Sequence, residues 1–258
     1  MPDLLIASIQ HNCDWAAREQ IRLFKNNLTD SHELIMVDNS TDPGASAAIR
    51  DICAATGTMY LPVPGLRHEH PDGLNFVAGA FRSLDVPDGV IFERGQPDFR
   101  RGRPSPRYIG FVDHDVFPRS RATVIDLIRP AGFFGIGQRH RPTGSRYVKP
   151  SFCFFDRQWL GGRALNFDGI RAADKADDGD CASMLAPLFS DEDWLRLPHM
   201  EHGYTHIREM DSAGLQSWAI EVFGNHGEWI HLFNLSRWLA VPDPDERERL
   251  VREMVEAL

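Results

Sequence analysis

The first 118 residues alternate between short apolar runs and segments with helical spacing, and this alternation constrains the fold more than any other feature. Short apolar runs are typical of buried strands, whereas apolar residues three or four positions apart are typical of helices. A chain that alternates strand and helix forms a parallel sheet with right-handed crossovers. We therefore predict an α/β protein with a mostly parallel central sheet flanked by helices. The expected strands are 4–8, 32–37, 59–63 and 108–112, and the expected helices are 15–28, 43–56 and 74–84, with Asp14 and Asp42 as caps of the first two.

Beyond residue 130 the alternation weakens, and the elements are harder to assign. Residues 161–182 are rich in glycine and aspartate and are expected to form a loop. We nevertheless expect the whole chain, 1–258, to form a single domain, because its length and its 42% hydrophobic content suit one large core. The further expected strands are 131–137, 147–155 and 220–223, and the further expected helices are 181–189 and 244–258.

Net charge, cysteine content and the length of apolar runs indicate which partners the protein can bind and in which compartment it acts. The formal net charge is −9, so the chain has no general attraction for nucleic acid or for an anionic membrane. Its four cysteines are scattered without a C-x-x-C pair, which favours free, buried thiols in a reducing compartment. The amino-terminal residues do not resemble a signal peptide, and no run approaches the ~20 apolar residues of a membrane helix. We expect a cytoplasmic protein without a membrane span, and peripheral membrane association stays open.

Polar clusters follow three of the expected strands at the point where each strand ends. They are Ser8-Ile9-Gln10, Asp38-Asn39-Ser40 and Asp113-His114-Asp115. The carboxyl ends of parallel strands share one edge of a sheet, and ligands bind at that edge. The sequence therefore predicts a ligand site to which Ser8, Gln10, Asp38 and Asp113 contribute.

Asp113 and Asp115 can both reach one divalent cation, because they lie two residues apart where a strand becomes a loop. Their hard carboxylate oxygens suit Mg²⁺ or Mn²⁺. Such an ion bridges carboxylates to a diphosphate, which would allow an acidic protein to bind an anionic ligand. The alternative interpretation is that Asp113 caps a turn and Asp115 is solvated.

Three segments resemble glycosyltransferases of the GT-A type, and family 2 in particular. They are ELIMVDNSTD (33–42), HPDGLNFVAGAF (70–81) and FVDHDVFP (111–118), in the family's order and at similar spacing. The resemblance implies a GT-A-like, Rossmann-like fold that binds a nucleoside-diphosphate sugar, UDP-linked by preference. It also implies that Asp38 and Asn75 contact the donor, Asp113 the ribose or metal, and Asp115 the metal.

A later segment, HLFNLSRW (231–238), is similar to the late histidine of several Mn²⁺-dependent GT-A enzymes. The resemblance implies that His231 is a third metal ligand and that Arg237 contacts the diphosphate. Arginine keeps the charge of the lysine often found there and can contact two phosphate oxygens. His226 is a competing candidate for the ligand, and a packed, hydrogen-bonded His231 is the alternative interpretation.

Carboxylates crowd the segment ADKADDGDCASML (173–185), which precedes an expected helix. Direct attack by an acceptor hydroxyl requires a general base, and crowded carboxylates raise one another's pKa. We predict that Asp177 or Asp180 fills this catalytic role. The alternative is a helix cap at Asp180 with solvated neighbours.

Taken together, these patterns and the resemblance predict a glycosyltransferase dependent on Mn²⁺ or Mg²⁺. Residues up to about 118 would bind the nucleotide sugar, and residues from about 119 would shape the site of the acceptor, which is a saccharide, a lipid-linked molecule or a small molecule. One alternative is a nucleotidyltransferase that makes the sugar nucleotide, although the first strand lacks the glycine-rich basic loop that cradles a triphosphate. The other is a catalytically inactive protein that binds a nucleotide sugar or a carbohydrate.

Overall fold

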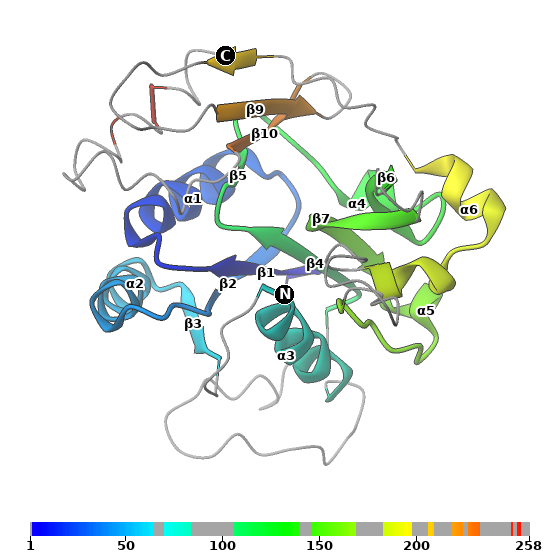
Figure 1. Ribbon diagram of the computed structural model, residues 1–258, viewed down its shortest axis with the longest axis horizontal. Coiled ribbons are helices and arrows are strands. Elements are labelled where there is room, and N and C mark those ends of the chain that lie inside the picture. Colours follow the sequence, from blue (N-terminus) through cyan, green and yellow to red (C-terminus); the bar gives the residue numbers. More distant parts are fainter. Residues whose placement is uncertain are drawn as a thin grey trace, which may run out of the picture.

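A six-stranded sheet forms the centre of the protein (Figure 1). The computed structural model describes residues 2–63, 70–83, 106–139, 146–168, 183–197, 206–208, 218–223, 227–232, 249 and 252–253. The order of the strands in the central sheet is β3 (Met59–Pro62), β2 (His32–Asp38), β1 (Leu4–Gln10), β4 (Tyr108–Asp113), β7 (Arg146–Asp156) and β6 (Phe133–Arg139).

Five of these strands run in the same direction. β1 is parallel to β2 and β4, and β2 is parallel to β3. β7 is antiparallel to both β4 and β6, so β7 alone is reversed and β6 again runs with β4. The prediction of a mostly parallel α/β sheet is confirmed. The carboxyl ends of five strands and the amino end of β7 consequently share one edge, called here the rim.

Helices cover both faces of the central sheet. α1 (Asp14–Asn27) and α2 (Pro43–Thr56) pack on one face, and α3 (His70–Ser83) packs on the other (Figure 1). Side chains alternate along β1 between these two cores, because successive residues of a strand point to opposite faces. Leu4 and Ile6 belong to the core under α1, and Leu5 and Ala7 belong to the core under α3.

The predicted caps have different outcomes. Asp42 caps α2 by accepting a hydrogen bond from Gly44 N at 2.8 Å, with Pro43 as the first helical residue, as expected. The prediction for α1 was wrong, because Cys13 is the N-cap without a side-chain bond and Asp14 is already helical. A carboxylate in the first turn still interacts favourably with the helix dipole. α3 begins four residues earlier than expected, at His70.

A second, four-stranded sheet lies on the α1 side of the central sheet (Figure 1). It consists of β5 (Val116–Pro118), β10 (Trp229–Leu232), β9 (Trp218–Phe223) and β8 (His206–Arg208), in that order. All of its pairings are antiparallel. The sequence predicted only the part of β9 from 220 to 223, because strands of three or four residues are too short for a period-two pattern.

The remaining described elements lie between and beyond the strands of the sheet. Of the helix expected at 181–189, the residues Ser183–Leu188 form a 3₁₀ helix. Pro187 lies within it, and proline lacks the N–H that an α-helix needs. Of the helix expected at 244–258, Arg249 and residues 252–253 are described and are helical. The short elements are α4 (Ile125–Ile128), α5 (Arg157–Leu160), the 3₁₀ helix (Ser183–Leu188) and α6 (Asp191–Arg196).

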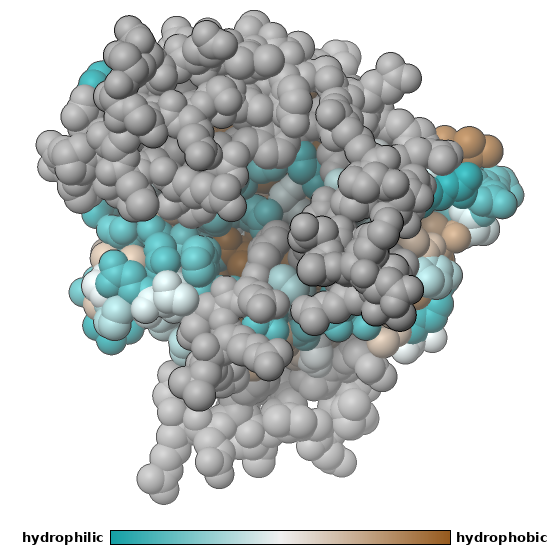
Figure 2. Space-filling view, in the orientation of Figure 1, coloured by the Kyte–Doolittle hydropathy of each residue, from teal (hydrophilic) through white to brown (hydrophobic). Residues whose placement is uncertain are grey.

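Figure 2 shows one face of the protein, with hydrophilic side chains gathered over α2 and hydrophobic atoms at α6, where Leu195 is 76% exposed. Cys13, Cys53 and Cys153 are buried free thiols, as predicted for these three. None of the helices within the described ranges is both long enough and apolar enough to cross a bilayer.

Candidate functional site

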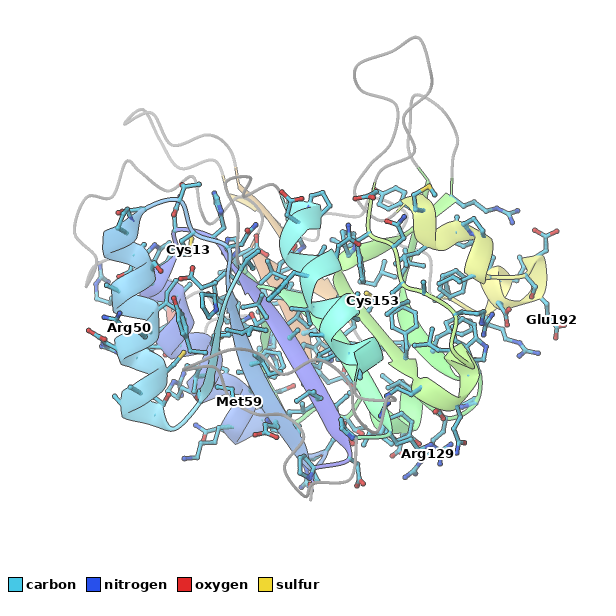
Figure 3. The ribbon with its side chains drawn as sticks, turned by 90° about the horizontal axis from the view of Figure 1, so that it is seen from below. Cys13, Arg50, Met59, Arg129, Cys153 and Glu192 are labelled. Atoms are coloured by element: carbon cyan, nitrogen blue, oxygen red, sulfur yellow. The ribbon has the colours of Figure 1, made fainter. Side chains whose placement is uncertain are left out.

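The register of the central sheet brings the three predicted polar clusters to the rim. Gln10, the last residue of β1, pairs with Asp38 of β2, and Ile9 pairs with Asp113 of β4. In Figure 3, Cys13, shortly after β1, and Met59, at the start of β3, lie at opposite edges of the sheet. The edge near Cys13 is the rim, where the ligand site is predicted to lie.

The Asp113-His114-Asp115 segment, called here the DHD turn, connects the two sheets. β4 ends at Asp113, and β5 begins at Val116 and pairs with β10 in the second sheet. In that pairing Val116 lies opposite His231. The topology thereby brings a histidine from near the carboxyl terminus next to Asp115.

Asp115 and His231 lie close together in a buried setting. Asp115 Oδ1 is 3.1 Å from His231 Nε2, and the two residues are 7% and 4% exposed. Burial raises the pKa of the Asp115 carboxyl, but the charge of His231, its hydrogen bond to Asp115 and the charges of His114 and Lys149 outweigh burial, and the resulting pKa is about 2. Asp115 is therefore a carboxylate at neutral pH, held among three basic side chains.

Three buried polar atoms at or beside the rim have no hydrogen-bond partner within the described part of the chain. They are Gln10 Oε1, His114 Nε2 and Ser151 Oγ. Buried polar atoms are nearly always hydrogen-bonded, so such a group indicates a place for a ligand. Gln10 Oε1 only accepts, so a ligand that reaches it would donate a hydrogen bond or bring a positive charge.

Asp38 has a different environment from Asp115. Its Oδ1 accepts a hydrogen bond from Ser40 N at 3.0 Å, and its Oδ2 accepts from Tyr60 Oη at 2.6 Å and from Ser46 Oγ. Burial raises the pKa of Asp38, but hydrogen bonds from the side chains of Ser40, Ser46 and Tyr60 and from Ser40 N outweigh it, and the net pKa is lowered.

Asn75 connects α3 to the segment that ends at residue 168. Its Nδ2 donates to Asp168 Oδ1, and its Oδ1 accepts from Phe167 N, both at 2.8 Å. Asn75, expected on the donor side, thus contacts two residues of the part of the chain expected on the acceptor side.

Gln20 links Ser8 and Gln10 to the DHD turn. Gln20 Oε1 accepts from Ser8 Oγ at 2.7 Å and from Gln10 Nε2 at 2.9 Å. Gln20 Nε2 donates to the carbonyl oxygens of Asp113 and Val116. Gln20 was not among the predicted site residues, although helical spacing places it on the same buried face of α1 as Ala16 and Phe24.

Lys149 and Ser151 were also missed. Gly137 pairs with Val148 and Gly135 pairs with Cys153, so four residues of β7 (149–152) lie opposite one residue of β6. Such bulges redirect side chains and are common beside functional sites. Phe152, at one end of the bulge, pairs with Val112 in the last pair between β7 and β4. Because Asp113 follows Val112, the bulge lies next to the DHD turn. The visible signal was a proline, Pro150, inside an aromatic strand.

The structure brings together some of the predicted site residues and not others. Asp115 and His231 meet, but no group of three or more His, Cys, Asp or Glu side chains within the described ranges is arranged to hold a metal ion. Asp113 therefore does not complete a cluster of three ligands with them. Four candidates lie outside the described residues, namely Asp177, Asp180, His226 and Arg237.

No protein-family model and no curated protein matches the sequence. Among solved structures, the chain is similar to the mannosyltransferase PcManGT from Pyrobaculum calidifontis in complex with GDP-Man and Mn²⁺, with 12% identity and a TM-score of 0.49. That match covers 78% of this chain and 55% of the other. The glycosyltransferase GlyE from Streptococcus pneumoniae TIGR4 is similar with 12% identity and a TM-score of 0.40, over 78% of this chain and 45% of the other.

Both solved structures are glycosyltransferases, the class of enzyme that the sequence motifs resemble. This chain spans about half the length of each of them.

Proposed function

We propose that this protein is a metal-dependent glycosyltransferase. It moves a sugar from a nucleoside-diphosphate sugar, UDP-linked by preference, to an acceptor hydroxyl. The observation that carries the proposal is the approach of Asp115 Oδ1 to within 3.1 Å of His231 Nε2 at the rim, from two distant parts of the chain.

The geometry of this pair suits two ligands of one divalent cation. Ligands at right angles around Mg²⁺, each at ~2.1 Å, lie about 3.0 Å from each other. The described contact of Asp115 Oδ1 is the one with His231 Nε2, and a cation bound between these two atoms would replace it. Mg²⁺ is commonly bound through one or two carboxylates, with water and substrate phosphates as the other ligands. Two described ligands are thus sufficient, and Asp113 remains a proposed contact to the ribose or the metal.

The charges around the pair suit a diphosphate. A divalent cation bound there would supply positive charge to the diphosphate as it leaves the sugar. Lys149, which is 5% exposed and lies close enough to lower the pKa of Asp115, adds a second positive charge beside the pair. We propose that Arg237 adds a third.

The donor and acceptor sides of the proposed site use different parts of the chain. Asp38 would hold the nucleoside through its carboxylate, with Ser8, Gln10 and Asn75 near it on the donor side. Asp177 or Asp180 would accept the proton of the attacking hydroxyl. We also propose that residues 1–258 act as one domain, in the cytoplasm.

Thermal unfolding with UDP, in the presence and absence of Mn²⁺, tests the proposal. We expect UDP to raise the melting temperature more with Mn²⁺ than without it. Asp115→Ala should abolish the part of the shift that depends on the metal. A shift that is the same with and without Mn²⁺ in the natural protein would contradict the metal site.

Release of UDP from a panel of UDP-sugars then separates an enzyme from a protein that only binds the nucleotide sugar. We expect slow hydrolysis of one donor even without an acceptor, dependent on Mn²⁺ and lost in Asp115→Ala. Metal-dependent binding of UDP without release from any donor or acceptor mixture would favour the non-catalytic alternative.

A further inference from the structure

The side-chain amide of Gln20 uses its full hydrogen-bonding capacity in the interior of the protein. Gln20 lies on the buried face of α1. Its two N–H groups donate to the carbonyl oxygens of Asp113, at 2.8 Å, and Val116, at 2.9 Å. Its oxygen accepts from Ser8 Oγ and Gln10 Nε2. A primary amide has two donors and two acceptor lone pairs, so these contacts fix both its position and the orientation of its two ends.

The two carbonyl groups that Gln20 binds belong to Asp113, the first residue of the DHD turn, and to Val116, the residue that follows the turn. The rest of the turn is held by backbone bonds, from His114 N to Ile9 O at 3.1 Å and from Leu232 N to Asp115 O at 2.8 Å. β1 and β10 therefore hold the middle of the turn, and the side chain of Gln20 holds its two ends. Gln20 does this from α1, which belongs to neither sheet.

Ser8 and Gln10 complete this network beneath the turn. Both residues are 0% exposed, and both donate to Gln20 Oε1. Gln10 Nε2 also donates to Ser8 Oγ at 2.7 Å. The polar residues at the end of β1 therefore support the amide that holds the turn.

We propose that Gln20 is a positioning residue for the cation site. It holds the ends of the DHD turn so that the Asp115 carboxylate stays beside His231, and Ser8 and Gln10 act on the site through Gln20. This inference rests on the proposed function, because it concerns how tightly the Asp115–His231 pair binds a divalent cation. Outer residues that orient metal ligands typically change metal affinity by 10–100-fold when they are substituted.

Two substitutions of Gln20 separate its shape from its hydrogen bonds. Gln20→Glu keeps the shape but removes both donors and places a carboxylate against two carbonyl oxygens. Gln20→Met keeps the length and leaves the same two carbonyl groups without their donor. Ser8→Ala is a milder variant, because it removes one bond to Gln20 Oε1 and no bond to the turn.

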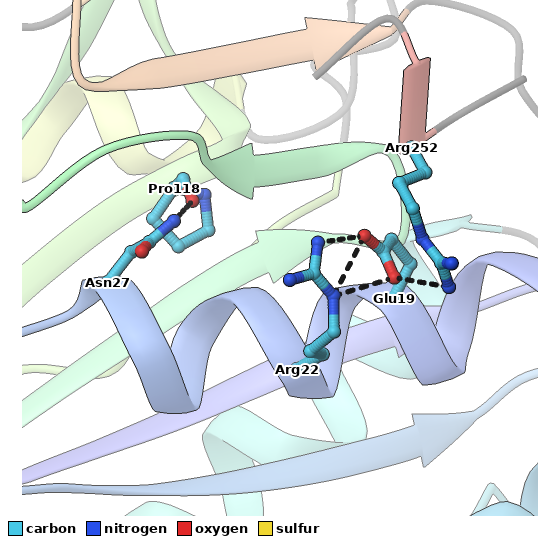
Figure 4. A network of polar contacts seen from close by, with 5 residues as sticks. All are labelled: Glu19, Arg22, Asn27, Pro118 and Arg252. Carbon is cyan, nitrogen blue, oxygen red and sulfur yellow. Dashed lines mark hydrogen bonds and ion pairs between the residues drawn. The ribbon is translucent and has the colours of Figure 1, made fainter. Parts of the chain in front are cut away.

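Asn27 provides a matched control on the same helix. Asn27 Nδ2 donates to the carbonyl oxygen of Pro118 at 2.7 Å, at the far end of β5 from the DHD turn (Figure 4). Asn27→Ala thus removes an amide-to-carbonyl bond between α1 and β5 without touching the turn. We expect it to lower the melting temperature and to leave the affinity for Mn²⁺ unchanged.

The experiment measures the binding of Mn²⁺ alone, by the electron paramagnetic resonance signal of the free ion, together with the melting temperature of each variant. We expect Gln20→Glu and Gln20→Met to weaken Mn²⁺ binding about tenfold or more, and Ser8→Ala to weaken it by a smaller factor. If the Gln20 variants do not fold, Ser8→Ala decides the outcome by the same comparison with Asn27→Ala.

The inference would be overturned if the Gln20 variants bound Mn²⁺ as tightly as the natural protein, and the proposed function would stay intact. If the Gln20 variants do not fold, the same comparison is made with Ser8→Ala. A natural protein that binds no Mn²⁺ would overturn both. Weaker binding in Asn27→Ala to the same degree as in the Gln20 variants would show that general loss of stability, rather than the position of the turn, controls the affinity.

Discussion

Two buried aspartates on either side of β1 show how similar sequence signals can produce different chemical environments. Asp38 ends β2 and Asp115 follows β4, and both have a lowered pKa. Hydrogen bonds from Ser40, Ser46 and Tyr60 stabilise the charge of Asp38. Nearby basic side chains, with His231 first among them, stabilise the charge of Asp115. The difference teaches that the kind of partner, hydroxyl and backbone donors for Asp38 and basic side chains for Asp115, distinguishes two buried carboxylates better than burial does.

The largest effect should come from Asp115→Ala. It removes one of the two proposed ligands, so we expect the affinity for Mn²⁺ to fall by about 100-fold, the upper end of the range even for residues that only orient ligands. Titration of the protein with Mn²⁺ measures the change. Asp38→Ala is the matched control and should keep the natural affinity for Mn²⁺ in the absence of nucleotide. If the two variants lose affinity equally, the distinction between the two carboxylates is wrong.

Asp38→Ala should instead reduce stability. It leaves the Ser40 N–H and the Tyr60 hydroxyl without their acceptor, and each hydrogen bond to a charged group contributes roughly 1.5–3 kcal/mol. Because the Ser46 and Tyr60 hydroxyls are 3.1 Å apart and can bond to each other, we expect a total loss of about 2–3 kcal/mol in the free energy of unfolding. Urea denaturation measures it. A loss below about 0.5 kcal/mol would indicate that water replaces Asp38 without cost.

Much of the fold could be predicted from the sequence, because its strongest patterns are local. The first strands and helices follow from apolar periodicity, and Pro43 after Asp42 marks the start of α2 correctly. The second sheet was mostly missed, because β5 and β8 have three residues each and are held by partners distant in sequence. The proximity of Asp115 and His231 depends on that sheet and was suggested by resemblance alone.

The supporting residues of the candidate site could not be predicted for a related reason. An amphipathic pattern treats each inward position of a helix as apolar, so the pattern gives no role to a buried amide such as Gln20. The position of Lys149 depends on a bulge, which breaks the period-two pattern of β7. Both residues act on groups that are distant in sequence and come near only in the folded chain. A single sequence therefore contains no direct signal for them.

The stabilising effect of Asp38 should depend on pH. Its pKa in the folded protein is below that of an unfolded aspartate, about 3.9, so the ionised group stabilises the fold above that value. This stabilisation is lost as the pH falls through the folded pKa. Asp38→Asn cannot titrate, so the difference in unfolding free energy between it and the natural protein should be constant above about pH 5 and shrink below about pH 4. Urea denaturation at pH 7 and pH 3.5 tests this, and a difference independent of pH would show that the charge of Asp38 does not matter.

The smallest expected effect is that of Tyr60→Phe, which removes one of the three donors to Asp38. Ser46 still donates to Oδ2, so we expect a loss of only about 1 kcal/mol in the free energy of unfolding, typical of one hydrogen bond. The pKa of Asp38 should rise, because the Tyr60 hydroxyl is one of the groups that lower it. The acid limb of the stability curve should therefore move to higher pH.

A double-mutant cycle with Asp38→Ala shows whether this effect passes through the carboxylate. If it does, Tyr60→Phe should cost much less stability in the Asp38→Ala background than in the natural protein, because its acceptor is already absent. Equal costs in the two backgrounds would mean that the Tyr60 hydroxyl acts independently of Asp38. In that case Asp38 would have more free capacity for a ligand than its contacts indicate, and it would resemble Asp115 more closely than the comparison of the two carboxylates requires.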